Sequence, residues 1–143
     1  MDFKIKRFNE LNAGEVYEIL KSRYEIFTVE KGMSCKDIDG RDYDALHCIL
    51  TNGGRLAAYL RAIPEPSGYR IGRVITLTHG VGNGRVLIQK SIEALQKEYD
   101  APTVYVHAQH DAVGFYEKCG FCTAGDGFIE EGVLHYPMEL KTQ

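Results

Sequence analysis

The sequence predicts an α/β fold of the mixed (α+β) kind, with a central mixed sheet of about seven strands and helices on both faces. The first half of the chain has the pattern of a strand, a helix and an antiparallel meander. The second half contains a strand–helix–strand unit whose spacing requires a parallel crossover. The length of 143 residues, with 44% hydrophobic and 26% charged residues, suits one globular domain, so we expect residues 1–143 to form a single domain.

The first elements follow from periodicity and capping signals. Charged and apolar residues alternate over residues 4–8, which predicts a short first strand. Asn12 and Glu15 have the spacing of a capping box, and the apolar residues that follow predict a helix over residues 13–29. Gly32 is expected to end that helix.

A polar connection rich in acids follows the first helix. Two interpretations fit it: a solvated loop, or a substrate loop that attracts cationic groups. Downstream, His47 is expected to be a packed polar residue, and Arg73 needs a partner if buried, either a carboxylate or a substrate. The acids of the connection are Asp37, Asp39, Asp42 and Asp44.

The remaining elements are bounded by turn residues. Asn52-Gly53-Gly54 predicts a hairpin turn, and a helix is expected over residues 83–99, ended by Asp100-Ala101-Pro102. Asp111 is a candidate cap for a short helix that Gly120 ends. The remaining predicted strands cover residues 46–51, 55–63, 69–78, 103–108, 121–124 and 134–140.

The glycine stretch His79-Gly80-Val81-Gly82-Asn83-Gly84 links the fourth predicted strand to the long helix. Unpaired amides and the helix dipole make such a helix start an anion site, best suited to phosphate. A nucleoside triphosphate is disfavoured because the stretch lacks the Lys-Ser/Thr pair of a P-loop. A dinucleotide is disfavoured because its glycines should follow the first strand.

This stretch resembles the acetyl-CoA signature Q/R-x-x-G-x-G/A of the GCN5-related N-acetyltransferases (the GNAT family), with His79 where Gln or Arg is usual. Farther on, the family often carries Asn, Ala, Tyr and Gly-Phe at fixed spacings. Here Gln replaces Asn, and the series is Gln109, Ala112, Tyr116, Gly120 and Phe121. The predicted order of elements is similar to this fold along nearly the whole chain.

Further segments resemble the small ElaA-type branch of that family. Their order and spacing carry the resemblance together. The segments are residues 23–30 and 37–39, His47, Gly72-Arg73-Val74, Ala108-Gln109, Phe115-Tyr116, residues 131–135 and Met138.

The resemblance implies acetyl-CoA as co-substrate. The pyrophosphate of CoA would lie on the amides of residues 80–85, and pantetheine would pair with the fourth strand like an added strand. The sheet must then splay between strands 4 and 5 to leave that edge open. The residues expected to bind acetyl-CoA are Val74, Ile75, Thr76, His79, Gly80, Val81, Gly82, Asn83, Gly84, Arg85 and Gln109.

The implied reaction is N-acetyl transfer to a primary amine by direct attack through a tetrahedral intermediate, with no covalent enzyme intermediate. Tyr116 is the expected general acid, because a phenol can protonate a leaving thiolate. The acceptor is expected to be a small amine or a peptide amine, and the acidic connection favours a cationic one. The general base stays open among His107, Glu25, Glu30, Asp39 and His135.

Two other functional classes remain as alternatives. A CoA-binding sensor or interaction domain without transfer activity would keep the same cofactor residues. A thiol oxidoreductase would use Cys119 and Cys122, although this pair follows a helix and does not open one. No second ligand pair accompanies these cysteines, so no metal is expected.

Composition limits the partners and the location. A net charge of −3 gives no reason to expect nucleic acid, and no apolar run approaches the roughly 18 residues of a membrane span. We therefore expect a cytoplasmic protein without membrane partners. Exposed strand edges near the C-terminus leave room for a homodimer.

Overall fold

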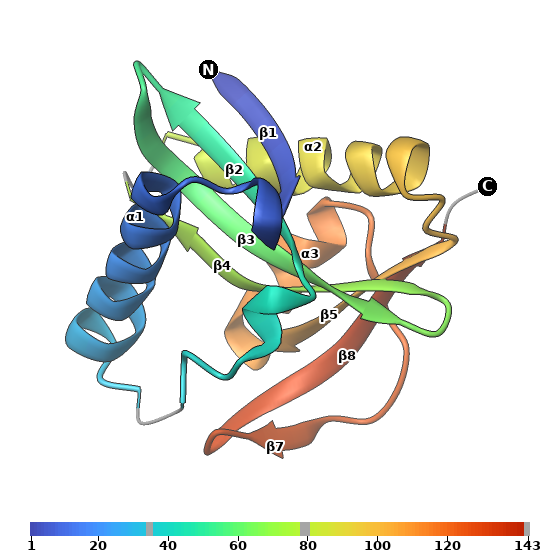
Figure 1. Cartoon of the computed structure of the whole chain (residues 1–143). Coiled ribbons are helices and arrows are strands. Elements are labelled where there is room, and N and C mark those ends of the chain that lie inside the picture. The colour runs from blue at the N-terminus through green and yellow to red at the C-terminus, as the bar shows by residue number, and fades with distance from the viewer. Residues whose placement is uncertain (34–35, 78–80, 142–143) are drawn as a thin grey trace.

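A computed structural model describes residues 1–33, 36–77 and 81–141. It contains one eight-stranded mixed sheet in the order β1-β2-β3-β4-β5-β8-β6, with β7 paired to β8 (Figure 1). The predicted mixed sheet is confirmed, with one strand more than the sequence pattern indicated. The strands are β1 (Asp2–Arg7), β2 (Leu46–Asn52), β3 (Arg55–Glu65), β4 (Gly68–Thr76), β5 (Thr103–Gln109), β6 (Cys122–Thr123), β7 (Phe128–Glu130) and β8 (Val133–Lys141).

Helices cover both faces of the sheet (Figure 1). They are α1 (Ala13–Arg23), α2 (Asn83–Glu98) and α3 (Val113–Lys118), with short turns η1 (Phe8–Glu10), η2 (Tyr24–Glu30), η3 (Arg41–Tyr43) and η4 (His110–Ala112). None of the helices in the described part of the chain is long and apolar enough to cross a membrane.

The two faces of the sheet bury two apolar clusters. The larger packs α2 residues such as Leu87 and Leu95 against Leu50 and Leu60 of the sheet. The smaller packs Ile19 of α1 and its neighbours against the opposite face. Alternate residues of β2 and β3 belong to opposite clusters, as the period of two in strands requires.

The first helix begins as predicted and ends differently. Asn12 accepts a hydrogen bond from the Glu15 amide at 2.8 Å, and the Glu15 carboxylate accepts one from the Asn12 amide at 2.9 Å, which confirms the capping box. The predicted continuous helix over residues 13–29 is instead α1 followed by the π-helical turn η2. Such widened turns are frequent at functional sites.

The C-terminal prediction needs two corrections. The strand predicted over residues 121–124 shrinks to β6, and the glycine-rich connection after it contains β7. A two-residue turn, Glu131-Gly132, joins β7 to β8 with φ values of 52° and 75°. Asp111 does not cap α3: it lies inside η4, and the N-cap position of α3 is Ala112, which makes no side-chain cap.

The crossover through α2 makes β4 and β5 parallel, as predicted, but only for part of their length. Pairing runs from Gly68 with Thr103 to Ile71 with Val106 and stops there. Beyond this point β4 stays paired with β3, and β5 stays paired with β8. The predicted splay between the fourth and fifth strands is therefore confirmed.

A β-bulge in β4 lies where the splay begins. Arg73 and Val74 together oppose the single residue Leu60 of β3, between the pairs Tyr59–Ile75 and Arg61–Gly72. Arg73 has a φ of 51°, in the left-handed region that side chains other than glycine rarely adopt. A bulge of this kind bends the strand and increases its twist, which turns β4 away from β5.

The start of the parallel pair depends on a close backbone approach at Gly68. A Cβ atom at this position would lie 1.8 Å from the carbonyl oxygen of Thr103. We predict that Gly68→Ala lowers the free energy of unfolding by at least about 3 kcal/mol, because the two strands must separate to make room. Urea denaturation measures this change.

Gly72→Ala is the matched control, because Gly72 lies in the same strand and an added Cβ there would have no atom within 4 Å. A Gly68→Ala protein as stable as the Gly72→Ala protein would contradict the prediction.

Candidate active site

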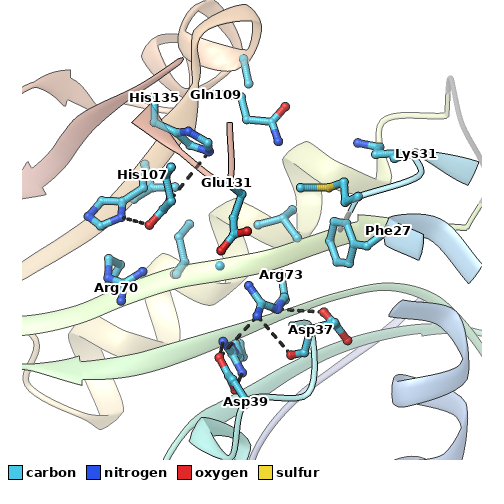
Figure 2. Close-up of a pocket in the computed structure, with 18 of the residues that line it drawn as sticks. Phe27, Lys31, Asp37, Asp39, Arg70, Arg73, His107, Gln109, Glu131 and His135 are labelled. Carbon is cyan, nitrogen blue, oxygen red and sulfur yellow. Dashed lines mark hydrogen bonds and ion pairs between the residues drawn. The ribbon is translucent and has the colours of Figure 1, made fainter. Parts of the chain in front are cut away.

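A cavity of about 570 Å³ lies at the splay between β4 and β5. Its walls come from both faces of the sheet: Phe27 and Lys31 from η2 and its end, and Phe115 and Tyr116 from α3. Figure 2 shows Glu131, Gln109 and the two histidines on one side of Arg73, whose guanidinium is joined by dashed lines to Asp37 and Asp39. Of the predicted site residues, Val74, Gln109 and Tyr116 line this cavity.

The start of α2, where the sequence predicts an anion site, has no side-chain cap. Gly82 is its N-cap residue with a φ of 75°. The first amides of α2 are therefore without intrahelical partners. Gly84 packs closely, since a Cβ there would lie 3.4 Å from the Thr76 side chain. His79 and Gly80, predicted for the same site, lie outside the described residues.

The open edge of β4 presents main-chain groups to the splay. The Leu77 amide donates to Ala57 of β3 at 2.9 Å. Because amides alternate along a strand, those of Val74 and Thr76 point away from β3 toward the open edge, whereas that of Ile75 faces β3. The Ile75 side chain is buried in the smaller apolar cluster.

Tyr116 lies on α3 at the wall of the cavity and is buried, with edge-on ring contacts to Phe115 and Phe121. Burial raises the pKa of its phenol to about 12, and the neighbouring Cys119 adds to the effect. The group is therefore protonated throughout the physiological pH range, as a proton donor must be before it acts.

Three arginines and three aspartates form a closed ring of ion pairs beside the cavity. Each arginine contacts two aspartates and each aspartate contacts two arginines. The six contacts are Arg23–Asp37 at 3.1 Å, Arg73–Asp37 at 2.8 Å, Arg73–Asp39 at 3.4 Å, Arg61–Asp39 at 2.7 Å, Arg61–Asp42 at 3.1 Å and Arg23–Asp42 at 2.7 Å. We call these six residues the Arg–Asp ring.

The Arg–Asp ring corrects both interpretations of the acidic connection. Asp37 and Asp42 are buried, so the segment is not simply a solvated loop. The charges of the ring cancel, so its acids do not form a surface that attracts a cationic acceptor. Asp44, in contrast, is exposed. Of the two partners that the sequence left open for Arg73, a carboxylate or a substrate, the structure shows carboxylates, those of Asp37 and Asp39.

The environment of the ring shifts two carboxyl pKa values. The hydrogen bond from Arg61 lowers the pKa of Asp39 far below its usual range. Burial by itself would raise the pKa of Asp42, but the hydrogen bond and charge of Arg23, together with Arg61, lower it overall. Two carboxylates stabilised in this way are poor proton acceptors.

His47 is a packed polar residue, as predicted. Its Nε2 lies 2.9 Å from the carbonyl oxygen of Asp42, and its Nδ1 lies 2.7 Å from the hydroxyl of Tyr59. A carbonyl only accepts, so Nε2 donates to Asp42 and Nδ1 accepts from Tyr59. Burial lowers the pKa of His47, which keeps the ring neutral and fixed beneath the Arg–Asp ring.

The candidates for the general base now separate. His107 and His135 line the cavity, whereas Glu25 and Glu30 are exposed and do not line it. Asp39 lines it as part of the Arg–Asp ring. Two further carboxylates at the cavity, on Glu130 and Glu131, were missed by sequence reasoning. The one signal for them was the Glu-Glu-Gly run before the last strand, whose turn geometry suits a hairpin.

The cysteine pair does not have the surroundings of a redox site. Cys119 follows the end of the short helix α3, and burial raises the pKa of its thiol. Cys122 is exposed in β6, and both are free cysteines. Within residues 1–33, 36–77 and 81–141, no group of three or more His, Cys, Asp or Glu side chains is arranged to hold a metal ion.

Comparisons with known proteins agree with this geometry. The family described as "Acetyltransferase (GNAT) domain" matches residues 28–142. The protein ElaA of Escherichia coli is 30% identical over 137 residues, covering 91% of this chain and 90% of ElaA. A UPF0039 protein of Schizosaccharomyces pombe is 33% identical over 146 residues, covering 99% of this chain and 97% of that protein.

Solved structures give the same result. The crystal structure of Escherichia coli ElaA superposes with a TM-score of 0.90 at 28% identity, covering 99% of this chain and 100% of that chain. An acyl-CoA N-acyltransferase from Pseudomonas aeruginosa superposes with a TM-score of 0.89 at 28% identity, covering 98% of this chain and 99% of that chain.

The fold, the splayed sheet and the glycine-led helix start define the class of acyltransferases that use an acyl-CoA. The chain belongs to the GCN5-related N-acetyltransferase family, and within it to the ElaA-type branch.

Removing one member of the Arg–Asp ring should destabilise the fold strongly. We predict that Asp42→Asn lowers the free energy of unfolding by about 3 kcal/mol, because Arg23, which is fully buried, and Arg61 then lose a shared counter-charge. Urea denaturation at pH 7 measures the loss. Asp44→Asn is the control, since Asp44 is exposed; equal stability of the two variants would contradict the prediction.

The lowered pKa values of Asp39 and Asp42 imply a pH dependence of stability. A carboxyl whose pKa is lower in the folded state stabilises the fold fully above its unfolded value, about 3.9, and the contribution is lost as the pH falls through the folded value. We therefore predict that the free energy of unfolding declines progressively below about pH 4. Asp39→Asn should decline less steeply, as measured by urea denaturation at several pH values. If the free energy of unfolding of Asp39→Asn declined as steeply with falling pH as that of the wild type, Asp39 would not be a source of the pH dependence.

Proposed function

We propose that this protein is an N-acetyltransferase that transfers the acetyl group of acetyl-CoA to a primary amine, with Tyr116 as general acid. The observation that carries the proposal is an open strand edge and a protonated buried phenol at one cavity, with an uncapped helix start beside the end of the same strand, where a Cβ at Gly84 would lie 3.4 Å from the Thr76 side chain. The acceptor we propose is a small amine or the amine of a peptide.

The residues present fit acetyl-CoA. Its diphosphate would be held by the amides of residues 81–85, with His79 and Gly80 as further parts of the same stretch and the exposed Arg85 supplying positive charge. Its pantetheine arm has amide and carbonyl groups spaced like a peptide, which suits the main-chain groups of Val74 and Thr76 at the open edge of β4.

Gln109 supports the same placement from the other side of the splay. It ends β5 beyond the last residue that pairs with β4, and its side chain lines the cavity. An amide side chain offers both a donor and an acceptor, so Gln109 can hydrogen-bond the amide groups of a pantetheine arm.

Acetyl-CoA supplies an activated acetyl group as a thioester. In the transfer, the amine nitrogen forms a bond to the acetyl carbon and gives a tetrahedral intermediate. The amine gives up a proton to a base, and the bond from the acetyl carbon to sulfur then breaks. Tyr116 holds the proton that the departing thiolate needs. Main-chain amides at the open edge of β4 can stabilise the developing negative charge on oxygen, since they point into the splay without a protein partner from β5.

The proposal is tested first by titration calorimetry with acetyl-CoA and then by release of free CoA thiol across a panel of amines, polyamines and peptides. We predict that Tyr116→Phe keeps the acetyl-CoA Kd within about twofold and lowers kcat about 100-fold, because the proton donor is lost while the ring contacts remain.

Tyr17→Phe is the control, because Tyr17 is an exposed residue of α1. Absence of acetyl-CoA binding would refute the proposed function. Binding without CoA release for any amine would favour a CoA-binding sensor or interaction domain, and equal turnover in Tyr116→Phe would remove Tyr116 from the mechanism.

A further inference from the structure

Two histidines and a glutamate gather on one wall of the cavity, away from the Arg–Asp ring. Glu130 Oε1 lies 3.4 Å from Nδ1 of His107, and Glu130 Oε2 lies 3.8 Å from Nε2 of His135. The three residues come from β7, β5 and β8, and all three line the cavity. Figure 2 shows the two imidazoles joined by dashed lines to the carboxylate between them.

The hydrogen bond of His135 determines which of its nitrogens is free. Nδ1 lies 2.8 Å from the carbonyl oxygen of Val133. Because a carbonyl only accepts, Nδ1 must carry the proton of the neutral ring, and Nε2 is left with its lone pair. The ring of Phe128 stacks on His135 with the centroids 5.9 Å apart, which holds the imidazole in this orientation.

Nε2 of His135 therefore faces a carboxylate while it has no proton to donate. A proton taken up at Nε2 would lie beside the Glu130 carboxylate, whose Oε2 is 3.8 Å away. The side chain of His135 is 8% exposed, which limits exchange with bulk water. Such a nitrogen is arranged to accept a proton inside the cavity.

The other groups at the cavity are less suited to this role. Asp37 and Asp39 are neutralised by the Arg–Asp ring. Glu131 is exposed on the β7–β8 turn and makes none of the ion pairs found among the described residues. His107 contacts Glu130 only through Nδ1. This nitrogen is buried, and its contact with Glu130 does not have the geometry of a hydrogen bond.

We propose that His135 is the catalytic base of the acetyl transfer and that Glu130 and His107 are its positioning residues. This inference rests on the proposed function. In the step, an N–H bond of the acceptor ammonium breaks, the electron pair stays on nitrogen, and the proton goes to Nε2 of His135 and later to solvent. The acceptor in this step is a primary alkyl amine that enters as its ammonium form, and Glu130 and Glu131 are the carboxylates of the cavity that lie outside the Arg–Asp ring.

The charged groups that line the cavity around His135 come from several elements. Glu130 and Glu131 lie on β7 and the following turn, His107 lies on β5, and Arg70 and Arg73 lie on β4. The cavity is also lined by Lys31, Lys36, Asp37, Asp39, Arg41 and Arg61. Glu130 is the carboxylate within ion-pair distance of His135 Nε2.

The first test needs no acceptor. Protein labelled with ¹⁵N-histidine is dialysed against EDTA, and a long-range ¹H–¹⁵N correlation spectrum above pH 8 reports the tautomer of His135. We expect a protonated Nδ1 and an unprotonated Nε2. The opposite tautomer would overturn the proposal, because a protonated Nε2 cannot accept a proton.

The second test measures CoA release with an amine that the panel identifies. We expect His135→Gln to lower kcat/KM about 100-fold at pH 7 with an unchanged acetyl-CoA Kd. Glu130→Gln should lower kcat/KM less, through kcat and not through the acetyl-CoA Kd, because His135 itself remains. His110→Gln, at an exposed histidine of η4 outside the cavity wall, is the matched control and should match the wild type.

The outcomes separate the two proposals. Turnover of His135→Gln within about threefold of the wild type would overturn the role of His135 and leave the acetyltransferase proposal standing. Failure of the wild type to bind acetyl-CoA would refute the proposed function itself. Circular dichroism and retained acetyl-CoA binding show that a slow variant is folded, and Glu130→Gln gives a milder second variant if His135→Gln does not fold.

Discussion

The Arg–Asp ring is the interaction on which the shape of the site depends. It joins α1 through Arg23, β3 through Arg61 and β4 through Arg73, with all three aspartates supplied by one connection. Buried ion pairs contribute little net stability compared with apolar packing, because desolvation offsets the attraction between the charges. The ring acts instead on geometry: it fixes the connection beside the cavity and holds Arg73 in a backbone conformation that costs on the order of 1–3 kcal/mol.

The bulge that Arg73 occupies gives the sheet its open edge. Parallel pairing of β4 with β5 ends at Ile71, and the bulge turns the rest of β4 away. The same divergence opens the cavity, exposes main-chain groups of β4 and leaves α3 and the β7–β8 hairpin to line the opening. A donor that binds like an added strand and an acceptor that approaches the histidine wall can thus meet in one space.

Much of the fold could be predicted from the sequence. The parts of the fold and site that could not be predicted have identifiable physical reasons. Periodicity and turn residues predicted the order of the elements and the parallel crossover, because these are local signals. Arg23, Asp37, Asp39 and Arg73 all belonged to the ElaA-type resemblance, but residues so far apart in the chain carry no mark of their pairing. Strand β7 escaped prediction because it has three residues among glycines. The π-helical turn η2 escaped because its apolar spacing is also that of an α-helix.

The central claim is that the edge of β4 left open by the splay receives the pantetheine arm of acetyl-CoA. Amide hydrogen exchange, followed by NMR residue by residue with and without acetyl-CoA, tests this most directly. The account predicts slower exchange at Val74 and Thr76 when acetyl-CoA is added, and little change over residues 69–71, which already pair with β5. Unchanged exchange at Val74 and Thr76 in protein saturated with acetyl-CoA would contradict it.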